Sequence, residues 1–290
     1  VFESLNLTYP KTEAGAPSFT KQYLSTHPHE VCQAIVKLRE FDKADSTFID
    51  TILKHEHKGR IHAEFHQLRS DDGGTVTGRF SSSNPNLQQI PARDPDIKKM
   101  IRGLFIPEDG TNWGSFDYSS QEPRLLVHFA ASVGKFKHAM VDTIVEEYHN
   151  GDVDLHQMVA DFAGITRKEA KVVNLGIMYG MGKGKLANQL DVSEAEAADI
   201  LSTHKEKVPF VKDLAELASK QASEYGVIRT LLGRRCHFHL YEPTTFGYSR
   251  PLPLEQARKE YGMSLRRAFT YKALNKLIQG PAADQTKKDM

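Results

Sequence analysis

One predicted helix carries four side chains that recur at every fourth position: Arg167, Lys171, Leu175 and Tyr179. Steps of four residues advance about 40° around a helix, so these side chains form one slowly winding stripe. Two cations come first, and an apolar side chain and an aromatic ring follow. Because a triphosphate needs positive donors and a nucleobase needs a flat surface, the stripe could hold both ends of one nucleotide. The spacing also fits a solvated basic face followed by a core-facing Leu and Tyr.

Local signals predict where this helix and its neighbours begin and end. Residues 166–169 have the form of a capping box, in which a Thr hydroxyl accepts from a backbone N–H and a Glu carboxylate reaches back. Residues 193–196 repeat the pattern with Ser and Glu. Pro209 should break or kink a helix, and Gly226 lies near the end of the next one. The stripe is therefore expected within a mostly helical region that runs onward from Pro123.

A second segment could place a carboxylate beside a helix start. Residues 112–117 read as a short strand that ends in Asp117, and residues 118–120 lead into a helix that begins near Gln121. Mg²⁺ prefers oxygen ligands, and a site that handles substrate phosphates typically has one or two carboxylates. Asp117 is therefore a candidate magnesium ligand. An Asp at this place also fits a simple helix cap.

A third segment, residues 77–91, is a polar loop rich in Ser, Asn and Pro with one guanidinium, Arg79. Its backbone and hydroxyls could follow a phosphodiester strand, although the same composition is typical of ordinary loops. Two further stretches are basic enough to contact nucleic acid, 54–69 and 258–276, and either also fits a solvated surface.

Composition limits the class of protein. With 290 residues and 39% hydrophobic content, the chain can bury a core in two or three subdomains. The net charge of +1 gives no global basic field, so nucleic-acid binding would depend on local patches. Two cysteines form neither a disulfide framework nor a zinc site, which fits a reducing cytoplasm. No stretch is apolar enough to span a membrane, and the start is neither a signal peptide nor a Met, so we expect it to lie inside a longer gene product.

Hydrophobic spacing predicts the remaining elements. Residues 29–54 carry apolar side chains at roughly helical spacing, which predicts helices with one buried face. Residues 60–68 alternate between apolar and polar, which predicts a strand before a turn at residues 71–74. The chain is therefore expected to be α+β and mostly helical.

The three motifs, in this order, resemble those of family A DNA polymerases. The resemblance covers the loop 77–91, the segment Asp117–Arg124 and the helix Arg167–Gly180, and it extends from residues 15–18 near the start to residues 275–284 at the end. It implies part of a right-hand polymerase core. Residues 1–58 would be the C-terminal part of the thumb, 59–120 the first part of a palm with an antiparallel sheet, 121–284 the complete fingers, and 285–290 the start of a second palm part.

The resemblance implies a role for each matching residue in phosphoryl transfer. Asp117, with the backbone carbonyl of Tyr118, would ligate the two catalytic magnesium ions. His156, Arg167 and Lys171 would bind the incoming deoxynucleoside triphosphate.

Other matching residues would select the nucleotide. Glu122 would exclude a ribose 2′-OH, Tyr179 would stack near the new base pair, and Gly180 would leave room beside it. Two positions depart from the family: Leu175 replaces a usual Phe or Tyr, and Ser120 replaces a usual Gln. Both lie near the expected substrate.

The resemblance also implies contacts with primer-template DNA. Arg79, Asn275 and Gln279 would contact the minor-groove side of the terminal base pair, where acceptors lie in similar places for every pair. Arg124 would help to position the primer end.

The family's last palm motif, His-Asp-Glu, supplies a second metal-binding Asp and would fall beyond Met290. The chain is therefore expected to be a fragment or half of a split DNA-directed DNA polymerase, inactive without that segment, with a C-terminal polymerase fragment or a processivity factor as further partner. If it is phage-encoded, it would act in the host bacterial cytoplasm. The alternatives are a single-subunit RNA polymerase-like enzyme and a non-catalytic DNA-binding or partner-binding module on a polymerase fold.

Overall fold

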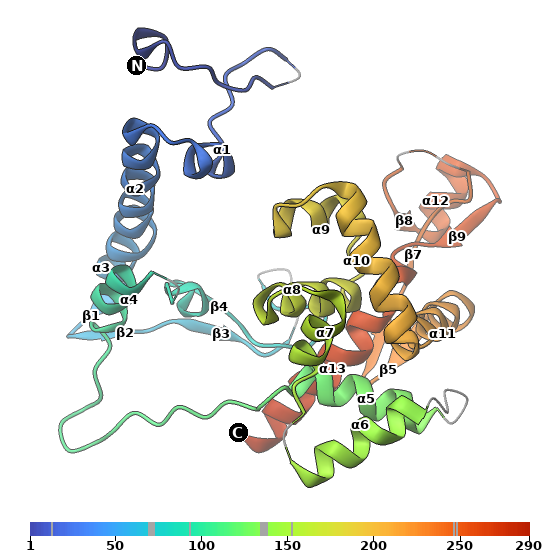
Figure 1. Ribbon diagram of the computed structural model, residues 1–290. Helices are drawn as coiled ribbons and strands as arrows, with labels where there is room; N and C mark the ends of the chain where they lie inside the picture. Colours follow the sequence, from blue (N-terminus) through green and yellow to red (C-terminus); the bar gives the residue numbers. More distant parts are fainter. Residues whose placement is uncertain are drawn as a thin grey trace. The chain divides into compact units, whose positions relative to one another are not determined.

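The computed structural model (Figure 1) describes residues 1–12, 14–68, 73–92, 94–133, 139–151, 153–245, 247 and 249–290. The chain forms two compact units. Unit 1 comprises Val1–His66 and Ser81–Ser115, and unit 2 comprises Gln67–Phe80 and Phe116–Met290.

Unit 1 combines short helices with two strand pairs. Its helices are η1 (Glu3–Leu5), α1 (Lys21–Thr26), α2 (Glu30–Ala44), the π-helical turn η2 (Asp45–Ile49), α3 (Asp50–His55), η3 (Leu87–Gln89) and α4 (Pro95–Arg102). Its strands are β1 (Glu56–His57), β2 (Arg60–Ile61), β3 (Glu64–His66) and β4 (Ser81–Ser83). The pairs β1–β2 and β3–β4 are both antiparallel.

The strand predicted over residues 60–68 is divided in the structure. β2 pairs with β1, whereas β3 pairs with β4, in the register Glu64↔Ser83. Because the chain changes partner between the two strands, the ladder is interrupted there. Asp71 and Asp72 of the predicted turn lie outside the described residues.

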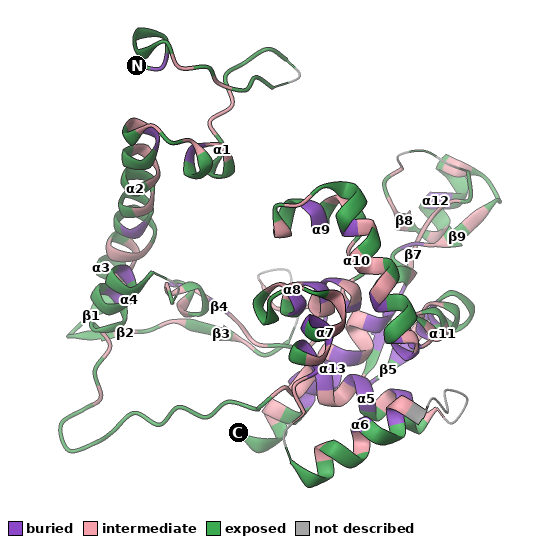
Figure 2. Ribbon diagram, in the orientation of Figure 1, coloured by how far each residue is buried: buried purple, intermediate pink, exposed green. Residues whose placement is uncertain are grey.

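The helices predicted over residues 29–54 are present, but their buried face is not continuous. Cys32 packs with Leu24 in one small cluster, and Ala44 packs with Ile101 in another. Leu38, which lies between these clusters on α2, is 68% exposed. Figure 2 shows that much of α2 is exposed.

Unit 2 is the larger, mostly helical unit. Its helices are α5 (Gln121–Ser132), α6 (Ala139–Asn150), α7 (Leu155–Ala163), α8 (Arg167–Met178), α9 (Lys183–Leu190), α10 (Glu194–Lys207), α11 (Pro209–Tyr225), α12 (Leu254–Tyr261), η4 (Thr270–Lys272) and α13 (Ala273–Asp289). Its strands are β5 (Val227–Arg229), β6 (Arg235–His237), β7 (Leu240–Pro243), β8 (Leu252–Pro253) and β9 (Leu265–Arg267). β5 and β6 form a hairpin, and β7 is the central strand of an antiparallel sheet in the order β8-β7-β9. The predicted α+β, mostly helical class is confirmed.

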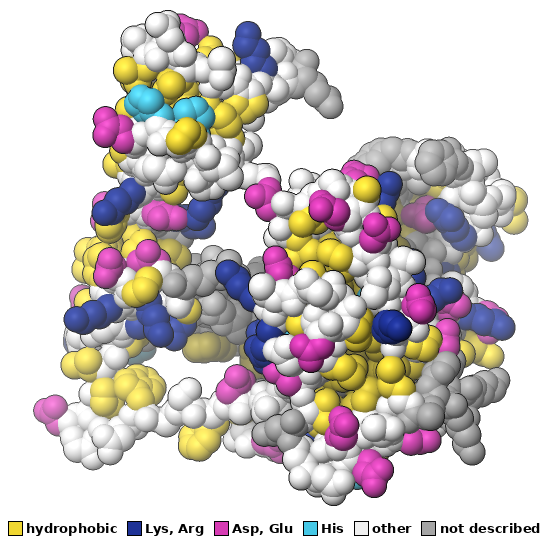
Figure 3. All heavy atoms as spheres, viewed as in Figure 1, with side chains coloured by type: hydrophobic (Ala, Val, Ile, Leu, Met, Phe, Trp, Pro, Cys, Tyr) yellow, Lys and Arg dark blue, Asp and Glu magenta, His cyan; other side chains and the backbone are white. Residues whose placement is uncertain are grey.

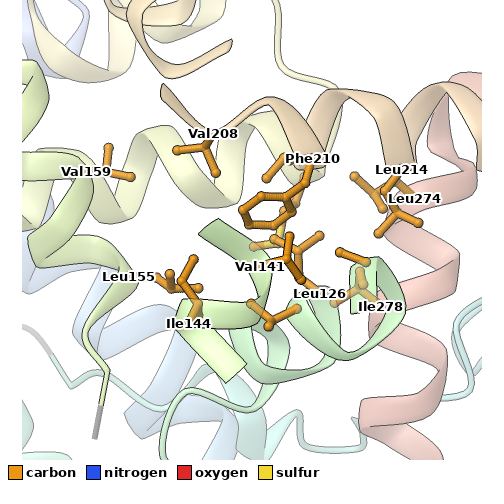
Figure 4. Close-up of a cluster of buried hydrophobic side chains, with 14 of the residues drawn as sticks. Leu126, Val141, Ile144, Leu155, Val159, Val208, Phe210, Leu214, Leu274 and Ile278 are labelled. Carbon is orange, nitrogen blue, oxygen red and sulfur yellow. The ribbon is translucent and has the colours of Figure 1, made fainter. Parts of the chain in front are cut away.

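The main core cluster of unit 2 joins α5, α6, α7, α8, α11 and α13. Figure 4 shows the Phe210 ring at the centre of this cluster, among side chains that include Leu126, Val141 and Leu214. Phe210 is fully buried, so its replacement by Ala should cost about 3–5 kcal/mol of folding free energy. α8 packs on α7, and α9 packs on α10. The core therefore holds the helix that carries the cationic stripe.

Several local predictions are confirmed. The capping boxes at Thr166 and Ser193 open α8 and α10, Pro209 separates α10 from α11, and Gly226 ends α11 with φ 70°. Both cysteines are buried free thiols. Within the part of the chain that the structure describes, no helix has the length and apolar character to cross a membrane.

Candidate functional site

Helix α8 presents the two cations of the predicted stripe to solvent. Its capping box has Glu169 N donating to Thr166 Oγ1 at 3.3 Å and Thr166 N donating to Glu169 Oε2 at 2.7 Å. Arg167 and Lys171 are exposed. Leu175 and Tyr179 are half-buried, whereas the buried residues of α8 are Ala170, Val173, Gly176 and Met178. The stripe thus runs from two exposed cations to an apolar and an aromatic side chain that pack against the core of unit 2. This arrangement fits a nucleotide site and also fits a basic face followed by a core-facing Leu and Tyr.

Asp154 links the starts of α7 and α8. Its Oδ1 caps α7 by accepting from the backbone N–H groups of His156 and Gln157, each at 3.0 Å, and its Oδ2 accepts from Arg167 Nε. Partial burial alone would raise the pKa of Asp154, but the hydrogen bonds from Arg167 and from the helix N–H groups lower it overall. The ionised carboxylate therefore fixes Arg167 beside the first turn of α7, where His156 lies.

His156 is only 8% exposed. Burial lowers the pKa of its imidazole, and the nearby cations Arg167 and Lys171 add to this effect against the opposing charge of Asp154. His156 is therefore neutral at pH 7. Toward a phosphate it can act as a neutral N–H donor.

A second cluster joins four predicted residues from separate segments: Arg79, Glu122, Tyr179 and Gln279. Arg79 donates to one carboxylate oxygen of Glu122, and the Tyr179 hydroxyl donates to the other at 2.7 Å. Burial, followed by the hydrogen bond to Glu122, raises the pKa of Tyr179 to about 12, and Gln279 also hydrogen-bonds the phenol. The side chain of Glu122 is 12% exposed. The cluster therefore holds the Glu122 carboxylate in a fixed place at the end of α8.

Gly180 follows this cluster and allows a close approach. Its φ is 71°, and a Cβ there would lie 3.3 Å from Cδ2 of Tyr271. Any larger residue would be strained in this conformation and would crowd the ring. Nothing in the sequence alone singled out Tyr271.

Arg234 joins the loop that carries Arg79 to helix α13. Its Nε donates to Asp284 Oδ1 at 2.6 Å, and one Nη donates to the carbonyls of Thr77 at 2.7 Å and Gly280 at 3.0 Å. Gly280 directly follows Gln279, and Asn275 lies one turn earlier on the same helix. Sequence reasoning missed Arg234.

The segment around Asp117 differs from the prediction. Residues 111–118 form no strand with any residue that the structure describes, and Asp117 is exposed. A strand exists only with a partner for its backbone groups, and the described residues offer none here. The N-cap of α5 is Ser120, so Asp117 does not cap that helix either. The hydroxyl of Tyr118 donates to Asp289.

The described residues form no complete metal site. Among the described residues, no three His, Cys, Asp or Glu side chains lie close enough together to hold a metal ion. Asp284 is engaged by Arg234. Asp117 fits the mode in which Mg²⁺ takes one or two carboxylates and completes its shell with water and substrate phosphates.

Arg124 and many other basic residues make contacts within the chain. Arg124 Nε donates to the carbonyl of Ser119 at 3.1 Å, and its guanidinium lies 4.5 Å from the centre of the Tyr148 ring. In the two basic stretches, Arg60 pairs with Glu108 and Arg266 with Glu242, and Arg69 lies outside the described residues. Figure 3 shows acidic and basic side chains interspersed on the face in view.

Comparison with known proteins gives consistent matches. The family model described as DNA polymerase family A matches residues 1–290. The DNA-directed DNA polymerase of Pseudomonas phage M6 is 34% identical over 334 residues, an alignment that covers 99% of this chain and 47% of the phage protein. DNA polymerase DpoZ of Acinetobacter phage SH-Ab 15497 is 32% identical, with 96% and 45% covered. The chain thus spans about half the length of these curated relatives.

A solved structure supports the same fold. The POL domain of Pol1 from M. smegmatis, in complex with DNA primer-template and dNTP, superposes with a TM-score of 0.69 at 28% identity, covering 97% of this chain and 48% of that one. The predicted polymerase-core fold is confirmed by this likeness.

Proposed function

Because the chain belongs to DNA polymerase family A, we propose that it takes part in template-directed DNA synthesis. In this reaction a primer 3′-OH attacks the α-phosphate of a deoxynucleoside triphosphate and releases pyrophosphate. The observation that carries the proposal is the convergence of Arg79, Glu122, Tyr179 and Gln279 at the end of the helix whose first turns present Arg167 and Lys171. Phage relatives favour action in a host cytoplasm.

The start of α8 would receive the triphosphate. Arg167 and Lys171 are exposed cations one turn apart, and His156 is tied to the same place through Asp154. Charged donors that are already in position stabilise the negative charge that develops on the phosphate oxygens. Arg167, Lys171 and His156 would thus orient the triphosphate and support its departure as pyrophosphate.

The end of α8 would receive the sugar and the base. Glu122 would occupy the space that a 2′-OH needs, since Arg79 and Tyr179 hold its carboxylate in place. The half-buried Tyr179 ring would stack near the new base pair, with Leu175 one turn before it.

The surface beside Glu122 would contact the terminal base pair. Arg79, Asn275 and Gln279 carry donors suited to the minor-groove acceptors, which test pair shape without reading sequence. Arg124 would position the segment 117–119 near the primer end through its hydrogen bond to Ser119.

Asp117 and the carbonyl of Tyr118 would be protein ligands of Mg²⁺, in the two-metal mechanism that the family resemblance implies. When bound, Mg²⁺ supplies a Lewis acid that neutralises charge on the reacting oxygens. The division into thumb, palm and fingers, and the dependence on a further palm segment, stay predictions.

Single-nucleotide incorporation tests the proposal. The protein as its gene encodes it would be given a primed template and each dNTP in turn, and only the complementary dNTP should be added. Preference for rNTPs would favour the RNA polymerase alternative. Binding of primer-template without incorporation of any nucleotide would favour the non-catalytic module.

A further inference from the structure

Three polar side chains from different helices form a hydrogen-bonded chain inside unit 2. His156 on α7 lies with Nδ1 3.0 Å from Asn174 Nδ2 on α8, and Asn174 Oδ1 lies 2.9 Å from His204 Nε2 on α10. His204 is 2% exposed. Apolar residues, including Leu126, line the same small cavity. Buried polar groups in such surroundings need defined partners, so each proton in this chain has a determinable place.

The carbonyl of Leu155 identifies which end of the Asn174 amide is the donor. Asn174 lies 3.1 Å from this carbonyl through the same atom that faces His156. A backbone carbonyl only accepts, so that atom is the Nδ2 amino group and Oδ1 faces His204. The Nδ2 end of the amide then requires an acceptor, and the Oδ1 end requires a donor.

These requirements determine both imidazoles. Asn174 Oδ1 only accepts, so His204 must carry a proton on Nε2. Asn174 Nδ2 donates, so His156 Nδ1 must be unprotonated. A neutral His156 therefore has its proton on Nε2.

We propose that Asn174 and His204 are positioning residues that fix His156 as the Nε2–H tautomer, so that this N–H is the donor offered to an oxygen of the incoming triphosphate. The assignment of the tautomer rests on the hydrogen bonds alone. The role toward the triphosphate rests on the proposed function.

Electrostatics agree with this geometry. Burial lowers the pKa of His204 to about 4, and burial also lowers the pKa of His156. Both imidazoles are therefore neutral at pH 7, where a choice between tautomers exists.

Nitrogen NMR of the full chain labelled with ¹⁵N-histidine tests the tautomer without any assay of activity. Long-range ¹H–¹⁵N correlation distinguishes protonated from unprotonated ring nitrogens, and His156→Gln and His204→Gln assign the signals. We expect a proton on Nε2 of both residues. Asn174→Asp, which has the same shape but only acceptors, should move the His156 proton to Nδ1. A proton on Nδ1 of His156 in the unchanged protein would overturn the proposal.

Kinetics test the link to the triphosphate. His204→Gln keeps an N–H donor for Asn174, whereas His204→Phe removes it. We expect His204→Phe to raise KM for the complementary dNTP roughly 10-fold, the effect of removing one hydrogen bond, with primer-template affinity unchanged. His204→Gln should restore most of the affinity for the dNTP.

The NMR and kinetic experiments separate the tautomer assignment from the role toward the triphosphate. Equal KM values for folded His204→Phe and His204→Gln would overturn the positioning role. If the NMR result is as expected but the unchanged protein incorporates no nucleotide, the tautomer assignment stands and the role toward the triphosphate, together with the proposed function, fails.

Discussion

His204 should make the stability of this protein fall as the pH is lowered below neutrality. Its imidazole is 2% exposed, and burial lowers its pKa from 6.5 to about 4. In the unfolded chain the same group is hydrated and protonates near its ordinary pKa. Between these two values the unfolded state binds a proton that the folded state does not bind, so acid favours unfolding.

The sign and the size follow from this difference. The stability is fully present above the unfolded pKa of 6.5 and is lost progressively as the pH falls toward 4. At pH 5 the loss from His204 alone is about 2 kcal/mol, and it approaches about 3 kcal/mol near pH 4. Because small proteins are stable by only about 5–15 kcal/mol, a loss of this size is measurable.

Urea unfolding followed by circular dichroism at several pH values between 5 and 7.5 measures the effect. His204→Gln keeps a donor for Asn174 but cannot be protonated, so its free energy of unfolding should fall by about 2 kcal/mol less than that of the unchanged protein between pH 7.5 and 5. His239→Gln, which removes an exposed imidazole, is the matched control. Carboxylates with lowered pKa values, such as Asp154, contribute equally to all three proteins. Identical pH dependence in the unchanged protein and in His204→Gln would refute the reasoning.

Three further outcomes concern the proposed nucleotide site. Lys171→Ala should lower the rate of single-nucleotide incorporation by at least about 10-fold with little change in primer-template affinity, since its ammonium would act on the triphosphate alone. Lys168→Ala makes the same charge change off the stripe and should leave the incorporation rate unchanged. A normal incorporation rate for Lys171→Ala would indicate that the stripe is an ordinary solvated surface. Glu122→Ala should shift selection toward ribonucleotides, measured as the ratio of incorporation efficiencies for matched deoxy and ribo substrates, and an unchanged ratio would count against a steric gate. Leu175→Tyr should improve the use of dideoxynucleotides, because a phenolic hydroxyl can supply the polar interaction that the absent 3′-OH would otherwise make; equal chain termination by both proteins would contradict this placement of Leu175.

The features that the sequence predicted well are those determined within one turn of chain. The capping boxes at Thr166 and Ser193 involve residues three apart, and the break at Pro209 follows from a missing N–H, so distant parts of the chain have little influence on them. The exposure of Arg167 and Lys171 on one face of α8 has the same local origin. Leu175 and Tyr179 pack partly against the core, as the alternative of a core-facing Leu and Tyr expected.

The features that failed or were missed depend on partners far along the chain. A strand at residues 112–117 would need a second strand as its partner. The burial of Leu38 depends on whether side chains of either small cluster on α2 pack against it. Arg234 contacts Thr77 and Asp284, which are 157 and 50 residues away. Asn174 did carry a signal, because a polar residue of modest helix propensity lies among apolar ones, but nothing in its neighbourhood identified His204 as its partner.

The Glu122 cluster shows why single substitutions there need careful reading. The phenol of Tyr179, with its pKa raised to about 12, stays protonated and donates to one oxygen of Glu122, and Arg79 donates to the other. Removing the carboxylate would therefore remove the proposed steric gate and at the same time free the Tyr179 ring and the Arg79 guanidinium, the proposed stacking and minor-groove groups, from their shared partner. Glu122→Gln keeps the volume and one acceptor oxygen, so a difference between Gln and Ala separates the space that the side chain fills from the hydrogen bonds that it accepts. If Glu122→Gln keeps sugar selection and Glu122→Ala loses it, the volume of the side chain is what excludes the 2′-OH. Loss of selection in both would assign that exclusion to the bonds by which Arg79 and Tyr179 hold the carboxylate in place.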